Sequence, residues 1–272
     1  MKTLKNHLIL FDAECPMCRL YTQAFVDTGL LDQTGRKSYQ KVLPANCPNV
    51  DRQRAVNEIA LINQETGEVS YGVYSLFKII GNAFPFFNPL FSFRPFGWIM
   101  SKAYAFISYN RRVIITAPEA AGELQPSFKL HYRIIYLLLT WFVTSIILTR
   151  YVLLMAPFVP ADGPYREYLV CFGQIIFQGI VVSVLFRGKL WNYLGNVMTI
   201  SFGGSLLLLL VLVLHRLIGT QPLIFTGWFI IVVGLMFLEH IRRSRIMGLG
   251  SWMTASWVTY RVIVLLLISL NQ

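Results

Sequence analysis

Cys15 and Cys18 are the residues of this sequence whose types and spacing most clearly allow chemistry. Residues three apart are neighbours on one turn of a helix, so the two thiols can cycle between a dithiol and a disulfide. The apolar run HLILF before them predicts a buried strand. The segment RLYTQAFVDTG after them predicts a helix that begins within the motif, with Pro16 at its first position. A helix N-terminus favours a thiolate at Cys15. We therefore expect Cys15 to be the nucleophile and Cys18 the thiol that resolves a mixed disulfide.

Charged residues surround the two cysteines. Asp12 and Glu14 would raise the pKa of a thiol by like-charge repulsion, and Arg19 could offset Glu14. Asp12 could instead accept the proton of the Cys18 thiol if it is buried at the end of the strand. The residue types leave both roles of Asp12 open.

Zinc binding is the alternative use of a CxxC motif, since one such pair can be half of a zinc site. The other ligands would have to be Cys47 and either His7 or His131, and this spacing matches no usual zinc pattern. The predicted order of strand, CxxC and helix favours redox chemistry, so we expect no bound metal. We interpret Cys47 as an incidental thiol and Cys171 as a packing residue.

The rest of the N-terminal region predicts a small α/β domain. Residues 36–42 form a weak candidate strand. Residues 58–62 and 68–71 predict a hairpin around the turn QETG, and 74–80 predict a helix that ends at Gly81.

The run FDAECPMC resembles the DxxCxxC signature of the DCC family of thiol-disulfide oxidoreductases. The hairpin, the helix after it and a closing stretch are also similar to that family; the closing stretch comprises Tyr104, Tyr109, Asn110 and Arg111. The resemblance covers roughly residues 6–112. It implies a thioredoxin-like fold. We expect no cofactor besides a redox-active disulfide between Cys15 and Cys18, although a quinone is possible.

Two features depart from the expected pattern. Ala13 stands where the family usually has glycine, so a turn with a positive φ would be strained. Thioredoxins place a cis-proline opposite the CxxC motif, but this sequence has no proline between Pro48 and Pro85. We expect Val56 and Asn57 to face the site instead.

Composition indicates a membrane protein. The chain has 272 residues, of which 55% are hydrophobic and only 14% charged, against about 25% charged in soluble domains. Residues 1–128 carry 13 basic and 10 acidic residues, a net charge of +3, whereas 129–272 carry 11 and 3, a net charge of +8. These values exclude a disordered or coiled-coil protein. They also make nucleic-acid binding a weaker interpretation, because the basic excess lies in short loops between apolar runs.

The sequence predicts three regions: a CxxC domain over 1–82, an aromatic connector over 83–128 and a membrane domain over 129–272. Segments near 133–155, 168–186, 194–214, 222–239 and 253–270 are each close to the roughly 20 residues that span a bilayer as a helix. Within the connector, 83–100 is rich in Phe and is interrupted by prolines, which is typical of the membrane–water interface; a re-entrant loop is the alternative. The aromatic residues 84–98 also leave open coupling to a quinone.

Loop charges predict the orientation of the spans. The apolar run near the N-terminus is too short for a signal peptide, so we expect this terminus in the cytoplasm. The cytoplasmic side then holds seven basic residues (Lys129, Arg133, Arg187, Lys189, Arg242, Arg243 and Arg245) and the other side three (Arg150, Arg166 and Arg216). We expect an integral protein of a bacterial inner membrane, with the CxxC domain in the cytoplasm and the C-terminus outside.

Polar residues within the predicted spans are candidates for function. Arg261 could snorkel to the interface, pair with Glu239 across helices or bind an anionic head group. Gln174 and Gln178 share one helix face and could hydrogen-bond a neighbouring helix.

Three functions remain open at this point. The first is a membrane-anchored thiol-disulfide oxidoreductase that acts on a protein or a small thiol or disulfide. The second is a redox enzyme coupled to a quinone. The third is a transporter, lipid-binding protein or scaffold whose CxxC domain is regulatory or binds metal. The first uses the most specific feature of the sequence.

Overall fold

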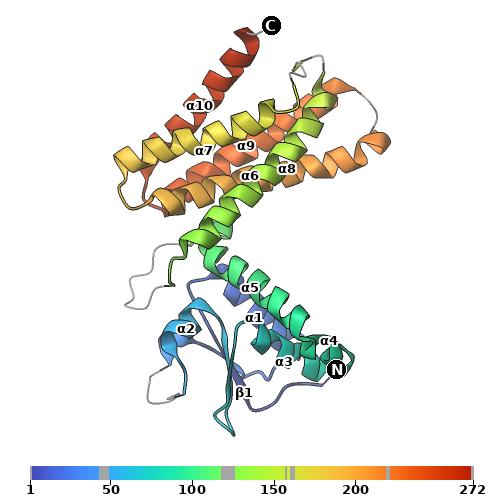
Figure 1. The fold of residues 1–272 in the computed structure, drawn as a ribbon, viewed down its shortest axis with the longest axis vertical. Coiled ribbons are helices and arrows are strands. Elements are labelled where there is room, and N and C mark those ends of the chain that lie inside the picture. The colour runs from blue at the N-terminus through green and yellow to red at the C-terminus, as the bar shows by residue number, and fades with distance from the viewer. Residues whose placement is uncertain are drawn as a thin grey trace. The chain divides into compact units, whose positions relative to one another are not determined.

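A computed structural model describes residues 2–42, 49–117, 126–156, 158–159, 163–218 and 221–270, without the side chains of 216–218. The chain divides into two units, Met1–Tyr132 and Arg133–Gln272 (Figure 1). The first unit therefore ends a few residues beyond the boundary at 128 that composition indicates.

The first unit is built on a four-stranded sheet in the order β2-β1-β3-β4. Strand β1 (His7–Phe11) is parallel to β2 (Arg36–Ser38) and antiparallel to β3 (Ala60–Asn63), which pairs with β4 (Val69–Tyr71) as a hairpin. The weak candidate strand over 36–42 is shorter than predicted, because a 3-10 turn, η1 (Tyr39–Lys41), follows β2 directly.

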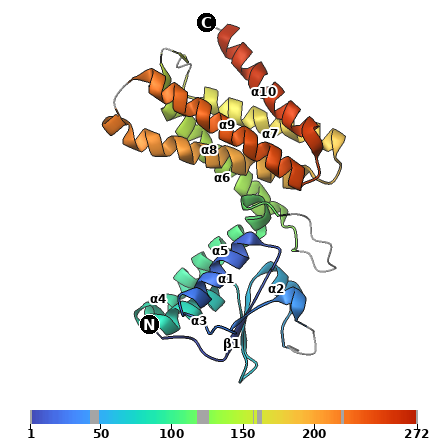
Figure 2. The same ribbon diagram turned by 180° about the vertical axis from the view of Figure 1, so that it is seen from behind.

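Helices cover both faces of this sheet. Helices α1 (Pro16–Asp27), α3 (Val73–Ala83) and α5 (Arg94–Ile114) lie on one side of β1, and α2 (Arg52–Asn57) lies on the other (Figures 1 and 2). Ile9 packs in the core on the first side, and Leu8 and Leu10 pack in the core on the second. All five residues of β1 are buried for this reason, which explains why its sequence is a continuous apolar run rather than an alternating one.

The aromatic connector is largely helical over residues 85–114, which belong to the first unit. It contains η3 (Pro85–Phe87), α4 (Asn88–Ser92) and α5. Pro95 occupies the first turn of α5, where a missing N–H costs nothing. Helix α3 continues to Ala83, past the stop predicted at Gly81. Large apolar side chains of the connector remain exposed (Phe84, Phe86, Leu90, Phe93, Trp98 and Ile99).

The second unit consists of helices long and apolar enough to cross a membrane. Five such segments are present in the described residues: Leu130–Met155, Arg166–Leu185, Leu190–His215, Pro222–Ile246 and Gly250–Leu270. They correspond to α6 (Leu130–Val152) with η4 (Leu153–Met155), α7 (Arg166–Leu185), α8 (Leu190–Ile218), α9 (Pro222–Ile246) and α10 (Gly250–Leu270). The number of spans agrees with the prediction, although most of the helices are a few residues longer.

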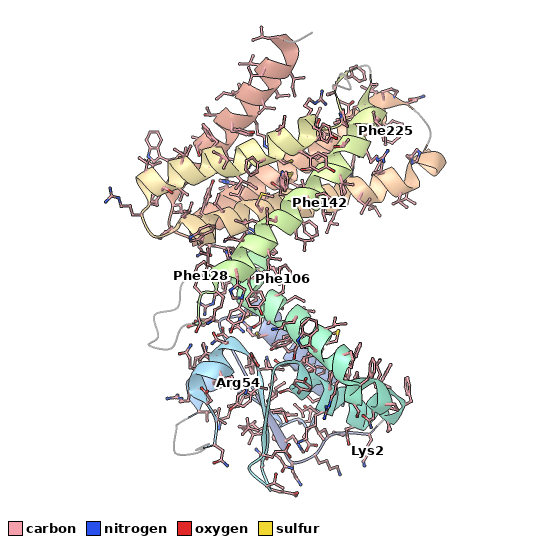
Figure 3. All side chains as sticks on the ribbon, viewed as in Figure 1. Lys2, Arg54, Phe106, Phe128, Phe142 and Phe225 are labelled. Atoms are coloured by element: carbon pink, nitrogen blue, oxygen red, sulfur yellow. The ribbon has the colours of Figure 1, made fainter. Side chains whose placement is uncertain are left out.

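Apolar side chains of the second unit lie both inside the bundle and on its surface. Phe225 is buried with Tyr151 and Val232, whereas Phe142 on α6 is half exposed (Figure 3). Many other exposed residues of these helices are Leu, Ile or Val. Such an apolar outer surface suits a lipid environment, so the chain is a membrane protein.

Candidate functional site

Cys15 is the N-cap of α1. Its backbone is extended (φ −90°, ψ 110°), and its sulfur accepts a hydrogen bond from the Cys18 amide at 3.4 Å. Pro16 occupies the first turn, as the sequence predicts. The thiol of Cys15 therefore takes the place of the oxygen that usually caps a helix, where free N–H groups stabilise negative charge.

The two thiols are buried and interact with each other. Cys15 is 1% exposed and Cys18 3% exposed, and both pack against Phe11. A hydrogen bond from the Cys18 thiol is the largest cause that lowers the pKa of Cys15, from 9.0 to about 6; burial opposes the shift and nearby Arg111 supports it. The same hydrogen bond and burial raise the pKa of Cys18. Cys15 is therefore the thiolate of the pair, and Cys18 keeps its proton.

A buried ion pair lies beside the thiols. Asp12 follows β1 directly, and its carboxylate binds the Arg111 guanidinium at 3.0 Å and that of Arg112 at 3.5 Å. The other carboxylate oxygen accepts hydrogen bonds from the Gln40 side chain (3.0 Å) and the Glu14 amide (3.1 Å). Both oxygens of Asp12 are therefore occupied by donors. As expected from the sequence, Asp12 still raises the pKa of Cys15, but it is the smallest of the causes.

Arg111 is one of the residues of this site for which the sequence predicts no role; it occurs only in the closing stretch of the family resemblance. Its guanidinium is almost fully buried and also donates to the carbonyl oxygens of Val56 (2.7 Å) and Asn57 (3.3 Å). The sequence holds one signal for such a residue: if Asp12 is buried at the end of its strand, its carboxylate needs a cation as a partner.

Glu14 has a different partner from the one considered above. Arg112 binds its carboxylate at 3.4 Å. In the described part of the chain, Arg19 forms no ion pair; its carbonyl oxygen accepts a hydrogen bond from Arg36 instead. Arg19 is exposed and forms no ion pair with Glu14.

Val56 and Asn57 contribute backbone rather than side chains to the site. The Val56 side chain packs in the core under α2, away from the thiols. The Asn57 side chain binds Ser127, and its carbonyl oxygen accepts a hydrogen bond from Ser108 as well as from Arg111. Their carbonyl groups thus hold Arg111 in position.

Ala13 is not strained. Asn6 is the only non-glycine residue with a positive φ in the described ranges, so the turn at Ala13 does not require glycine. The backbone amide of Ala13 donates to Gln40 at 3.2 Å. The expectation of a strained turn before the motif is therefore wrong.

Two tyrosines close the site on the side of α5. Burial raises the pKa of Tyr104 to about 12, and it raises the pKa of Tyr21 as well. The Tyr104 hydroxyl accepts a hydrogen bond from the Ile59 amide at 3.1 Å. Both hydroxyls remain protonated beside the thiols.

Within the described residues, the CxxC motif has no neighbouring side chains that could complete a metal site. No group of three His, Cys, Asp or Glu side chains able to hold a metal ion occurs there, and the described cysteines are free. Cys47, the possible third ligand, lies in 43–48, outside the described residues.

The polar residues of the second unit have unequal surroundings. The Gln178 oxygen accepts hydrogen bonds from Tyr193 (2.7 Å) and Ser256 (3.1 Å), whereas both polar atoms of the buried Gln174 side chain lack a protein partner. Glu239 pairs with Arg242 and Arg243 on its own helix, at 2.6 and 2.7 Å. The pairing of Glu239 with Arg261 considered from the sequence is therefore absent.

Comparison of the chain with family models, with curated proteins and with solved structures finds no match.

Proposed function

We propose that this protein is a membrane-anchored thiol-disulfide oxidoreductase that uses the Cys15–Cys18 dithiol. The observation that carries the proposal is the position of Cys15 at the N-cap of α1, with its pKa lowered to about 6 by the Cys18 thiol. At pH 7 such a group is about nine-tenths thiolate, against about one-hundredth for a thiol of pKa 9. The thiolate is the nucleophile in disulfide exchange.

The proposed reaction transfers two electrons. The Cys15 thiolate attacks a substrate disulfide, forms a mixed disulfide and releases one substrate thiolate. Cys18 loses its proton, attacks the Cys15 sulfur, closes the Cys15–Cys18 disulfide and releases the second substrate thiolate. The substrate disulfide is reduced and the dithiol is oxidised. The two substrate thiolates take up one proton from Cys18 and one from solvent; the reverse sequence oxidises a substrate dithiol.

We assign a positioning role to Asp12 rather than that of a base. Four donors approach its two oxygens, which leaves no oxygen free to take the proton of Cys18. Asp12 instead fixes Arg111, whose positive charge favours the thiolate of Cys15. In this role Asp12 acts through Arg111.

A thioredoxin-like fold of the DCC type is part of the proposal. Support comes from the parallel unit of β1, α1 and β2, with CxxC at the start of its helix, followed by the antiparallel hairpin of β3 and β4. A second support is the ion pair between Asp12 and Arg111, because these residues belong to the first and last segments of the resemblance.

Burial of the thiols limits what can react. With Cys15 only 1% exposed, a disulfide reaches the sulfur only when Met17 or the neighbouring loops move. We therefore expect small disulfides to react faster than folded protein disulfides.

The proposal is tested by measuring whether the purified full-length protein, reduced and freed of reductant, reduces a small aromatic disulfide with a stoichiometry of one disulfide per chain. Cys15→Ser should abolish the reaction, and Cys18→Ser should accumulate a mixed disulfide at Cys15. Cys171→Ser is the matched control, since Cys171 is also buried and free but lies far from the motif in sequence. Full activity of Cys15→Ser would falsify the proposal.

A further inference from the structure

The five spans enclose a cavity of about 190 Å³ that the thiol chemistry does not use. Every span contributes to its wall, which is mostly apolar, with residues such as Leu148, Leu208 and Val264. An apolar cavity of about 150 Å³ is large enough to bind benzene. The cavity of this bundle can therefore hold a head group and the first methylenes of a chain.

Most polar side chains in the wall already have partners. Arg166 and Glu167 pair with each other at 2.7 Å. The Thr144 and Ser205 hydroxyls lie 3.5 Å apart, and Ser205 also donates to a backbone carbonyl. These groups require nothing further from a ligand.

Gln174 is the first exception. It is 2% exposed, it lines the cavity, and neither its amide nitrogen nor its oxygen has a protein partner. Buried amides normally have their hydrogen bonds satisfied, because the alternative leaves a desolvated polar group. A ligand in the cavity would supply the missing partner.

Arg261 is the second exception, and it carries charge. It lies eleven residues after the start of α10 at Gly250 and nine before its end at Leu270. At about 1.5 Å per residue, its backbone is about 14–16 Å from either end of the helix, too far for easy snorkelling. Among the described residues no carboxylate forms an ion pair with Arg261. Glu167 acts on its charge only from beyond ion-pair distance and is itself paired with Arg166. The Arg261 Nε has no hydrogen-bond partner, and the guanidinium lies 5.0 Å from the centroid of the Trp257 ring.

We propose that this cavity binds an amphipathic anion, with its charged oxygens on Arg261 and Gln174 and its apolar chain along the wall. A guanidinium presents two parallel donors that match a carboxylate or a phosphate. The Gln174 amide adds a third donor. With Arg166 and Glu167 compensating each other, the cavity wall carries one net positive charge, which selects a single anionic head over a neutral one.

Two sources provide this chemistry, a free fatty acid and the phosphate head of a membrane phospholipid. Full-length protein in dodecyl maltoside, stripped of lipid, is titrated with oleate, with dioleoylphosphatidic acid and with oleyl alcohol as the neutral control. The readouts are the melting midpoint and the stoichiometry by native mass spectrometry. We expect saturable stabilisation by one or both anions and none by the alcohol. Oleate alone would assign a fatty acid, phosphatidic acid alone a phospholipid head, and both would assign recognition of the shared anionic head.

Variants separate this site from general detergent effects. Arg261→Met should raise the dissociation constant of the anion by about tenfold or more, and Gln174→Leu should weaken binding less. Arg150→Met, at the exposed end of α6, is the matched control and should bind as the wild type does. Arg261→Lys retains the charge and keeps part of the affinity, so the test does not depend on the folding of the Met variant.

The ligand-free proteins give an independent readout. Without an anion, Arg261→Met should melt at a higher temperature than the wild type, because it removes a charge that lies within an apolar span and has no ion-pair partner. Equal effects of oleyl alcohol and oleate, unchanged anion binding by Arg261→Met, or no stabilisation by either anion would overturn the proposal. None of these results bears on the Cys15–Cys18 chemistry.

Discussion

Replacing Cys18 tests whether its thiol is what lowers the pKa of Cys15. The shift from 9.0 to about 6 has the Cys18 hydrogen bond as its largest cause, while burial acts in the opposite direction. Three pKa units correspond to about 4 kcal/mol. Cys18→Ala removes the thiol donor but keeps the backbone amide, so we expect the pKa of Cys15 to return to about 8.5 or above. Cys18→Ser keeps an O–H donor and should preserve most of the lowering.

The assay is the pH dependence of alkylation of Cys15 by iodoacetamide between pH 4 and 10, in a background with Cys47 and Cys171 replaced by serine. A rate at a single pH would mislead. At pH 7 the thiolate fraction falls about 30-fold when the pKa rises from 6 to 8.5, but the intrinsic nucleophilicity rises about tenfold over the same change. The two effects nearly cancel, so the midpoint of the profile is the quantity to measure.

The outcomes are distinct. A Cys18→Ala midpoint near 6 would refute the reasoning and assign the lowering to the helix N-terminus and Arg111. A wild-type midpoint near 8.5 would mean that Cys15 is not activated. Cys18 itself does not interfere, because its raised pKa keeps it protonated over this range.

Three further predictions follow from the same contacts. Arg111→Met should raise the alkylation midpoint of Cys15. It should also lower the free energy of unfolding, measured by urea denaturation, by about 3–5 kcal/mol, because Asp12 remains buried without this cation. The double variant with Asp12→Asn should lose less free energy of unfolding than the sum of the two single variants. The melting midpoint of the reduced protein should rise between pH 6 and 8.5, because the pKa of Cys15 is lower in the folded than in the unfolded chain. This gain in stability is lost as the pH falls through about 6. The melting midpoint of Cys15→Ser should show no such rise. A maleimide should label Cys15 and a cysteine placed at Gln272 from opposite sides of the membrane, as an odd number of spans requires; labelling from one side contradicts five spans.

Local patterns in the sequence predict the parts of this molecule that are held by local forces. The run HLILF and the Pro16 at the first turn indicate β1 and α1, and predominantly apolar segments close to the roughly 20 residues that cross a bilayer indicate the spans. The partner of Asp12 is different, because Arg111 follows 99 residues later and no periodicity connects them. Burial of Asp12 requires a cation but does not identify which one.

Gln174 and Gln178 show the same limit within the membrane unit. They are four residues apart on α7, and their sequence surroundings favour the same role for both. Tyr193 on α8 and Ser256 on α10 reach Gln178, while Gln174 faces the cavity. The difference arises from which side chains the neighbouring helices bring opposite each position, which is tertiary information.

Local sequence patterns identify the surroundings of neither Arg111 nor Arg261. Replacing each of these arginines by Met should have opposite effects on the stability of the protein. Arg111 forms an ion pair with a carboxylate and donates to backbone carbonyl oxygens, so its charge has a direct counter-ion in the protein. Arg261 lines a cavity and forms no ion pair with a carboxylate of the described chain. Removal of Arg111 leaves Asp12 without its closest cation and should destabilise the protein, whereas removal of Arg261 relieves an uncompensated charge and should stabilise the ligand-free form. Melting midpoints of the two Met variants that shift in the same direction would contradict the assignment of one arginine to a closed site and the other to an open one.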